Sequence, residues 1–134
     1  MTLSDVKLAY GSGESDQLFN IETATLQGGA GGNVIDAHSF TLGSVILRGM
    51  GGIDKLIGGT RDDIIEPGAG DDVVDGGAGN DSVVANGGND VVYGNKGDDD
   101  LAGGSGNDEL YGGLGNDTLT GGDRKSTRLN SSHT

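Results

Sequence analysis

The sequence has no cysteine, a single proline and only 4% aromatic residues. Without cysteine the chain can form neither disulfide bonds nor thiolate zinc sites. Basic residues are also scarce, because 8 Lys and Arg stand against 21 Asp and Glu. This balance argues against a nucleic-acid partner, whose phosphates need cationic contacts. No apolar run approaches the roughly 20 residues that span a bilayer, and the start, MTLSDVKLAY, lacks the basic and apolar regions of a secretory signal.

Glycine and negative charge dominate what is present. The 134 residues, enough for one domain, include 29 glycines and carry a formal net charge of −13. Few apolar residues with a large uncompensated charge are typical of disordered chains, because burial of apolar surface cannot offset the chain entropy. We therefore expect either disorder or a cation that neutralises and organises the chain.

A nine-residue repeat begins at Gly49 and runs through eight copies, from GMGGIDKLI to GGLGNDTLT. The fourth position is glycine in seven copies, with Arg61 as the exception. The sixth position is always aspartate, at Asp54, Asp63, Asp72, Asp81, Asp90, Asp99, Asp108 and Asp117. The eighth is always aliphatic, at Leu56, Ile65, Val74, Val83, Val92, Leu101, Leu110 and Leu119. A bias in composition would not keep these residues in register, so the repeat is structural.

The period predicts an all-β solenoid, because a helix would need apolar residues every three or four positions and few glycines. One aliphatic residue between two free positions suits a short strand whose central side chain points inward. Glycine at the first, second and fourth positions, and Asn or Asp at the fifth, suit turns with positive φ. Two strands and two turns make one coil, and coils stack by parallel pairing at about 4.8 Å. The eight repeats therefore predict four coils.

In such a stack alternate repeats share an edge, so the aspartates form two columns. One column holds Asp54, Asp72, Asp90 and Asp108, and the other holds Asp63, Asp81, Asp99 and Asp117. Stacked carboxylates about 5 Å apart repel by about 1 kcal/mol per pair even in water. Carboxylates together with the carbonyls of tight turns are, however, the hard oxygen ligands that Ca²⁺ prefers. Three gaps in each column predict up to six Ca²⁺ sites.

The repeats GGAGNDSVV, GGSGNDELY and GGLGNDTLT match the pattern GGxGxDxUx, in which U is aliphatic. Through this pattern residues 49–122 resemble the RTX (repeats-in-toxin) family. The resemblance implies a right-handed parallel β-roll that folds on binding Ca²⁺, with the ion between successive turns, held by the sixth-position aspartates and by turn carbonyls. Carried over to this sequence, those carbonyls lie near Gly70, Gly77, Gly79, Gly88, Gly97, Gly104, Gly106, Gly113 and Gly115.

Several departures from the pattern lie in the turns. Arg61 places a side chain and a positive charge where glycine is expected, so the site between Asp63 and Asp81 is the one expected to be weakest. Ala85 and Asn86 replace two glycines, and Pro67 replaces another and removes an N–H. We expect weaker or empty calcium sites at these turns.

Residues 1–48 are predicted to form degenerate strands and rungs of the same solenoid. The segment GGAGGNVID at 28–36 fits the repeat with Asn33 in place of aspartate, which makes a poor calcium ligand. A wider loop through His38 and Phe40 is expected before Leu47.

Two further segments lie at the ends of the chain. Alternating apolar residues over 6–10 and 19–21 predict plain strands, and DQLFNIE at 16–22 resembles junctions between repeat blocks of large RTX adhesins. Residues 123–134 begin DRKSTRLNSSH, which resembles the translation of a common sequencing-library adapter. We interpret them as read-through and expect the natural sequence to differ after Gly122.

Alternative sites are weaker. An EF-hand loop starting at Asp98 would put Ala102 at a ligand position, and its glycine-rich flanks cannot form two helices. No serine elbow, zinc-protease helix or P-loop lysine occurs, so we expect no catalytic residue here, and His38 is interpreted as a loop residue. Tyr93 and Tyr111 should stack on one outer face, where a ladder that stiffens the sheet is favoured over a site for a partner.

The sequence therefore predicts a calcium-binding β-roll segment of a larger secreted bacterial protein, such as an adhesin or surface protein. The resemblance implies an extracellular location reached by type I secretion, with neighbouring repeats or domains of the parent protein as partners. The alternative is an accessory folding and secretion domain of a protease, lipase or epimerase, or of a toxin. What flanks the segment would distinguish these roles.

Overall fold

The computed structural model describes residues 23–122 and 127–129, and all regular structure there is β. The first half contains β1 (Ala24–Gln27), β2 (Val34–Asp36), β3 (Val45–Gly51), β4 (Lys55–Ile57), β5 (Ile64–Ala69) and β6 (Val73–Asp75). The second half contains β7 (Ser82–Val84), β8 (Asn86–Gly87), β9 (Val91–Lys96), β10 (Asp100–Ala102), β11 (Glu109–Leu114), β12 (Thr118–Thr120) and β13 (Thr127–Leu129). No helix in the described part could cross a membrane.

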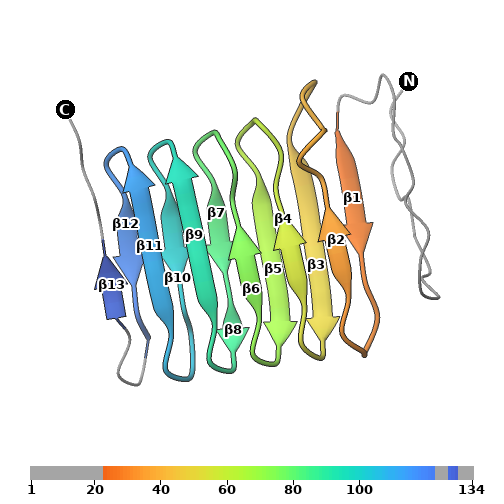
Figure 1. Ribbon diagram of the computed structural model, residues 1–134, viewed down its shortest axis with the longest axis vertical. Helices are drawn as coiled ribbons and strands as arrows, with labels where there is room; N and C mark the ends of the chain where they lie inside the picture. Colours follow the sequence, from red (N-terminus) through yellow and green to blue (C-terminus); the bar gives the residue numbers. More distant parts are fainter. Residues whose placement is uncertain (1–22, 123–126, 130–134) are drawn as a thin grey trace.

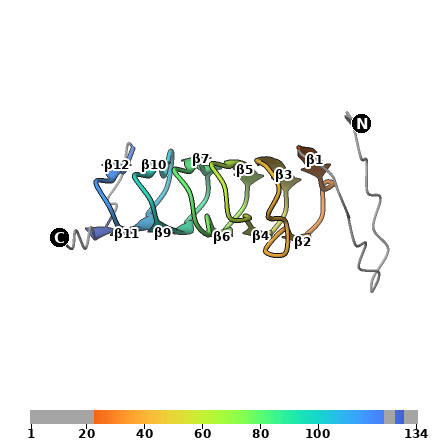
Figure 2. The ribbon, with the colours of Figure 1, turned by 90° about the horizontal axis from the view of Figure 1, so that it is seen from above.

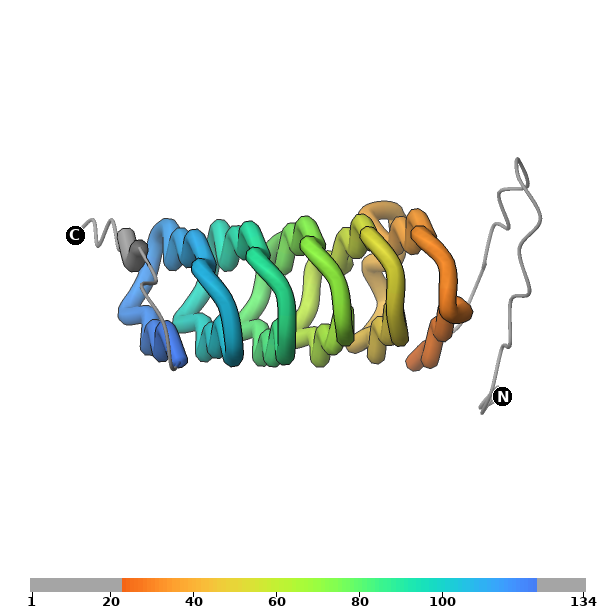
Figure 3. Tube along the Cα trace, turned by 90° about the horizontal axis from the view of Figure 1, so that it is seen from below, coloured from red at the N-terminus to blue at the C-terminus, as the bar shows by residue number. Residues whose placement is uncertain are grey.

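Successive strands alternate between two parallel sheets, as Figures 1 and 2 show. One sheet has the order β1-β3-β5-β7-β10-β12, with β8 added beside β5, and the other has the order β13-β11-β9-β6-β4-β2. Figure 3 shows the chain winding in successive flattened coils that stack along one axis. The chain is a parallel β-solenoid of about five turns, so the predicted fold class is confirmed, and the segment before the eight repeats extends the predicted stack.

The register reproduces the repeat. Leu47 pairs with Ile65 and Leu56 with Val74, both offset by 18 residues, whereas Leu26 pairs with Leu47 across 21. The three additional residues belong to the loop between β2 and β3, which confirms the wider loop predicted there.

The core is a row of eighth-position side chains between the two sheets. The row is fully buried at Leu47, Leu56, Ile65, Val74, Val83, Val92, Leu101 and Leu110, and Leu119 packs partly buried against it. Near the N-terminal end the core is wider, because Ala24, Ala37, Phe40 and Val45 join Leu26 and Ile35. The prediction that one aliphatic residue per repeat points inward is confirmed.

The turns correct part of the sequence interpretation. Positive φ occurs at the second and fourth positions, as at Gly77 (100°) and Gly79 (119°), and at the second position even Asn86 (74°) and Asn95 (75°) adopt it. The fifth-position residues do not have positive φ, and neither do the first-position glycines, so these two expectations were wrong. At Gly76 the first position needs glycine for space, because a Cβ there would lie 2.6 Å from Oδ2 of Asp81, whereas Pro67 and Ala85 occupy this position in two other repeats.

The ends of the chain are only partly described. The strands predicted within residues 1–22 lie outside the described residues. Of the tail, residues 127–129 form β13, which pairs with β11 in the 18-residue register. The edge of a sheet offers backbone groups that any extended segment can pair with, so the interpretation of 123–134 as read-through stays a prediction.

Candidate metal site

The sixth-position aspartates lie in two buried columns, one on each edge of the solenoid, as predicted. Exposure is 2% or less at Asp54, Asp63, Asp72, Asp81, Asp90, Asp99 and Asp108. Each carboxylate reaches back toward the preceding coil. The backbone N–H of Asp63 donates to Oδ1 of Asp81 (2.8 Å), and that of Asp81 donates to Oδ1 of Asp99 (2.8 Å). The columns are therefore chains of hydrogen bonds that join one coil to the next.

The second carboxylate oxygen of most of these aspartates has no hydrogen-bond partner. Among the described residues, Oδ2 is buried and unpartnered in Asp54, Asp72, Asp81, Asp90, Asp99 and Asp117. Burying an anionic oxygen without a partner is unfavourable, and proteins compensate such groups with hydrogen bonds or metal ions. These oxygens thus mark positions where a cation would stabilise the fold.

The aspartates also have altered acidity. Burial, together with the nearby carboxylates of Asp63 and Asp99, raises the pKa of Asp81 to about 7. The hydrogen bond from the Asp63 N–H acts in the opposite direction. Burial likewise raises the pKa of Asp90 to about 7, and it raises the pKa of Asp72. These shifts follow from crowding like charges in a site with little water.

Backbone carbonyls supply further oxygens in the same turns. The hydrogen bonds between described turns use carbonyls of the second, third, sixth and ninth positions, such as those of Gly77, Lys96 and Asp81. The fourth-position carbonyls of Gly70, Gly79, Gly88, Gly97 and Gly106 accept none of these bonds. The aspartate carboxylates and these turn carbonyls together supply oxygen donors, which are the ligands that suit Ca²⁺. The described residues contain no group of three or more His, Cys, Asp or Glu side chains placed to hold a metal.

The turn at 58–63 differs from the other repeat turns, as the sequence suggested. Neither Gly59 nor Arg61 has positive φ, and the Arg61 side chain reaches outward to the Thr41 carbonyl (3.3 Å). Both oxygens of Asp63 accept backbone N–H groups, from Val45 (2.8 Å) and Gly59 (2.6 Å). Asp63 is therefore satisfied by the chain itself, and it is the least suited of the predicted ligands.

The other departures lie in the opposite column. Ala85 and the ring of Pro67 are buried at first positions of their repeats, yet Oδ2 of Asp72 and Asp90 remains without a partner. The weaker sites expected at these turns stay a prediction.

Asn33 stands at the N-terminal end of the column that contains Asp54, and it acts mainly as a hydrogen-bond donor. Its backbone N–H donates to Oδ1 of Asp54 (2.7 Å), and its Nδ2 donates to the same atom (3.2 Å) and to the Gly31 carbonyl. The side-chain oxygen of Asn33 accepts the Gly29 N–H (3.4 Å), and the expectation that Asn33 is a poor calcium ligand stays a prediction.

A second set of columns, which the sequence interpretation missed, runs beside the aspartates on the exposed edges. It consists of the fifth-position residues Asp62, Asp71, Asn80, Asn89, Asp98, Asn107 and Asn116. Five of these side chains accept a backbone N–H group from the following coil, as Oδ1 of Asp62 does from Asn80 (2.8 Å); the five are Asp62, Asp71, Asn80, Asn89 and Asp98. The recurrence of Asp or Asn every nine residues was a visible signal, but it was assigned to backbone conformation instead.

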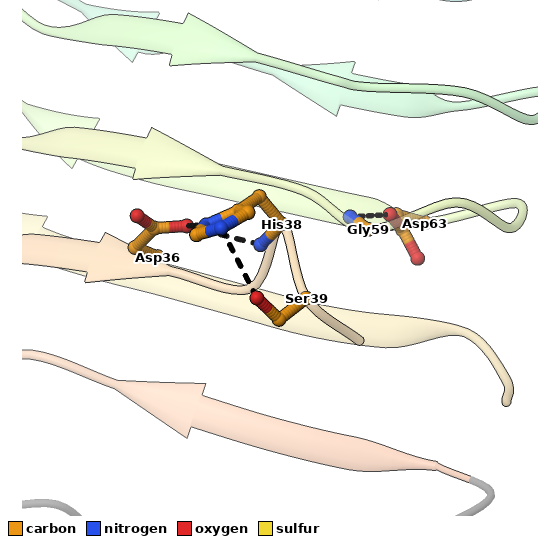
Figure 4. A network of polar contacts seen from close by, with 5 residues as sticks. All are labelled: Asp36, His38, Ser39, Gly59 and Asp63. Carbon is orange, nitrogen blue, oxygen red and sulfur yellow. Dashed lines mark hydrogen bonds and ion pairs between the residues drawn. The ribbon is translucent and has the colours of Figure 1, made fainter. Parts of the chain in front are cut away.

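His38 takes part in a polar network in the wide loop (Figure 4). Its Nδ1 lies 2.6 Å from Oδ1 of Asp36, and its Nε2 lies 3.0 Å from Oγ of Ser39. The order Asp–His–Ser matches that of a hydrolase relay. However, the His38 side chain is 70% exposed. The backbone N–H of His38 also donates to Oδ1 of Asp36 (3.0 Å), which is a local turn between neighbouring residues. The network thus supports the interpretation of His38 as a loop residue.

Tyr93 and Tyr111 stack on the outer face of the second sheet, with ring centroids 4.9 Å apart and planes 12° apart. The Tyr111 hydroxyl donates to Glu109 (2.9 Å). The EF-hand alternative is excluded, because Asp100–Ala102 and Glu109–Leu114 are strands β10 and β11.

Comparison with known proteins agrees with this geometry. The family model described as the RTX calcium-binding nonapeptide repeat matches residues 48–83, 77–110 and 93–123, which together cover more than half of the chain. No curated protein and no solved structure matches the chain.

Proposed function

Because the chain belongs to the family of RTX calcium-binding nonapeptide repeat proteins, we propose that it binds Ca²⁺ in the gaps between its stacked turns, and that folding is coupled to this binding. The observation that carries the proposal is the row of buried Oδ2 atoms without partners. In each gap the carboxylate of one coil and the fourth-position carbonyls would hold the ion. Bound calcium would supply positive charge that neutralises the columns and ties neighbouring coils together.

Electrostatics explains why binding and folding are coupled. Without a cation, folding brings buried carboxylates into columns, and the slim aliphatic row offers little apolar burial to offset this repulsion. A ligand that binds only the folded state stabilises it by about 2.7 kcal/mol per site when its concentration is 100 times the dissociation constant. Several such sites would exceed the usual stability of a domain of this size.

Circular dichroism during a calcium titration tests this function. We expect a disordered spectrum in chelator and β structure at about 0.1–1 mM Ca²⁺, the range of extracellular calcium modules. Mg²⁺ at the same concentration serves as the control, because it requires a tighter octahedral shell. Equal β content in chelator and in calcium would refute the proposal. Because the ends of a solenoid need caps, the same titration is repeated on the chain extended by its natural downstream sequence.

For the parent protein we propose a secreted bacterial adhesin or surface protein, outside the cell, in which these coils serve as a binding module without catalysis. The acidic composition and the family's usual occurrence in secreted proteins support this role. Sequencing the source DNA on both sides of the segment tests it. Adhesive domains and further repeat blocks would support the proposal, whereas an adjoining protease, lipase or epimerase domain would replace it with an accessory folding role.

A further inference from the structure

The two sets of side chains on each edge reach in opposite directions along the solenoid. A sixth-position aspartate accepts an N–H group from the coil before it, as Asp81 does from Asp63 (2.8 Å). A fifth-position side chain accepts an N–H group from the coil after it, as Asp62 does from Asn80 (2.8 Å). Asp62 and Asp81 therefore reach into the same gap from opposite coils. The fifth-position residue adds a second side chain to each candidate calcium site.

The same reciprocal pair of hydrogen bonds recurs in five gaps. Asp71 accepts from Asn89 (2.8 Å) while Asp90 accepts from Asp72 (2.8 Å). The remaining reciprocal pairs join Asn80 with Asp98, Asn89 with Asn107, and Asp98 with Asn116, each beside its own aspartate bond. Asp and Asn make the same backbone hydrogen bond here through Oδ1, so this bond does not distinguish them.

Charge does distinguish them, and it divides the six gaps into three classes. Each gap is named here by the sixth-position aspartate that reaches into it from the later coil. The fifth-position side chain of the earlier coil is an acid in the gaps closed by Asp81, Asp90 and Asp117, where it is Asp62, Asp71 and Asp98. It is a neutral amide in the gaps closed by Asp99 and Asp108, where it is Asn80 and Asn89. It is apolar in the gap closed by Asp72, where Ile53 stands 71% exposed.

Given the proposed calcium binding, we propose that the fifth-position residue sets the affinity of each gap. An acid there adds a full negative charge at the rim of the site without changing the backbone bond, whereas an amide does not. A unit charge at a separation of several ångströms from a divalent ion changes its affinity by about threefold to tenfold in water. In turns of the same geometry, a gap with an acid therefore binds more tightly than one with an amide, and the gap at Ile53 binds most weakly. In the gap closed by Asp81, the positive charge of Arg61 and the different turn at 58–63 oppose the gain from Asp62. Calcium fills the gaps over a range of concentrations.

Isosteric exchange of Asp and Asn tests this assignment on the full chain. One variant carries Asp62→Asn, Asp71→Asn and Asp98→Asn, and a second carries Asn80→Asp and Asn89→Asp. Asp100→Asn is the matched control, because it removes one charge from an exposed outward position of β10. Calorimetry with CaCl₂ gives the affinities and the number of ions, and circular dichroism at saturating calcium verifies the fold.

We expect the triple variant to bind calcium about threefold to tenfold more weakly per altered gap, the double variant to bind more tightly, and the control to change less than twofold. At 1 M salt, where the screening length falls to about 3 Å, the differences should shrink. Unchanged affinities in both variants, or differences that persist in 1 M salt, would overturn the assignment. If the triple variant does not fold, the double variant decides alone. Failure of the unmodified chain to bind calcium would instead refute the proposed function.

Discussion

Around β1 and β2 the interior is filled by Phe40, Val45, Leu26, Ile35 and two alanines, whereas from β5 onward the core narrows to the eighth-position aliphatic residue of each repeat, with Ala85 beside it. The columns change over the same distance. The columns begin at Asn33 and Val45, which bring no carboxylate and whose backbone N–H groups donate to Asp54 and Asp63. Further along the chain, most of the aspartates have an Oδ2 atom without a partner. We therefore expect the N-terminal coil to be held by apolar packing and hydrogen bonds, and the later coils to depend on a cation. The turn at 58–63, with its satisfied Asp63, is the boundary between them.

The largest expected effect comes from the middle of a column. Replacing Asp81 and Asp99 together with alanine removes two buried carboxylates, and we expect a loss of about 5 kcal/mol at saturating calcium, from two sites of about 2.7 kcal/mol each. Asp117→Ala lies at the edge, where the residue is only half-buried, so its effect should be less than half as large. Denaturant unfolding in excess calcium measures both, and equal losses would contradict the stacked arrangement.

An intermediate effect is expected in the N-terminal coil. Phe40→Ala removes a buried aromatic side chain that is 8% exposed, which costs about 3 kcal/mol by analogy with other core truncations. The number of calcium ions bound per chain should not change, because Phe40 meets the turn at 58–63 through its backbone carbonyl, which accepts the Thr60 N–H (3.3 Å) and which the substitution leaves in place. Calorimetry with calcium checks this, and Leu42→Ala, at a position 55% exposed in the same loop, is the control. A reduced number of bound ions would show that the two regions are not independent.

The last expected effect concerns pH in the absence of calcium. Asp81 and Asp90 have folded-state pKa values of about 7 against 3.8 for an ordinary aspartate, so the folded state binds more protons between these limits. The resulting stability is present below about pH 4 and is lost as the pH rises through about 7. In chelator, circular dichroism should therefore show more β structure near pH 4 than at pH 8. A variant with Asp81→Asn and Asp90→Asn should have a flatter profile, and identical profiles would contradict the assignment.

Much of this architecture could be predicted from the sequence because each repeat forms the same unit of structure. The aliphatic and aspartate positions recur every nine residues, so the core row and the two columns followed from the period alone. The turns could be predicted less well, since a glycine is required either by positive φ, as at Gly79, or by a close carboxylate, as at Gly76, and the sequence does not separate these causes. The outer columns were missed because a side chain such as that of Asn80 can accept a hydrogen bond either within its own turn or from the next coil. The sequence does not distinguish these two cases, whereas the stacked structure does.

The central claim, that the later coils depend on calcium for their structure, is tested most directly by residue-resolved hydrogen exchange with and without chelator. The amide N–H groups of Asp72, Asp81, Asp90 and Asp99, which donate along the columns, report on it directly. We predict strong protection of these amides in about 10 mM CaCl₂ and none in excess EDTA. This calcium concentration is about ten times the upper end of the range in which we expect the chain to fold. Equal protection of these four amides in both conditions would contradict the account.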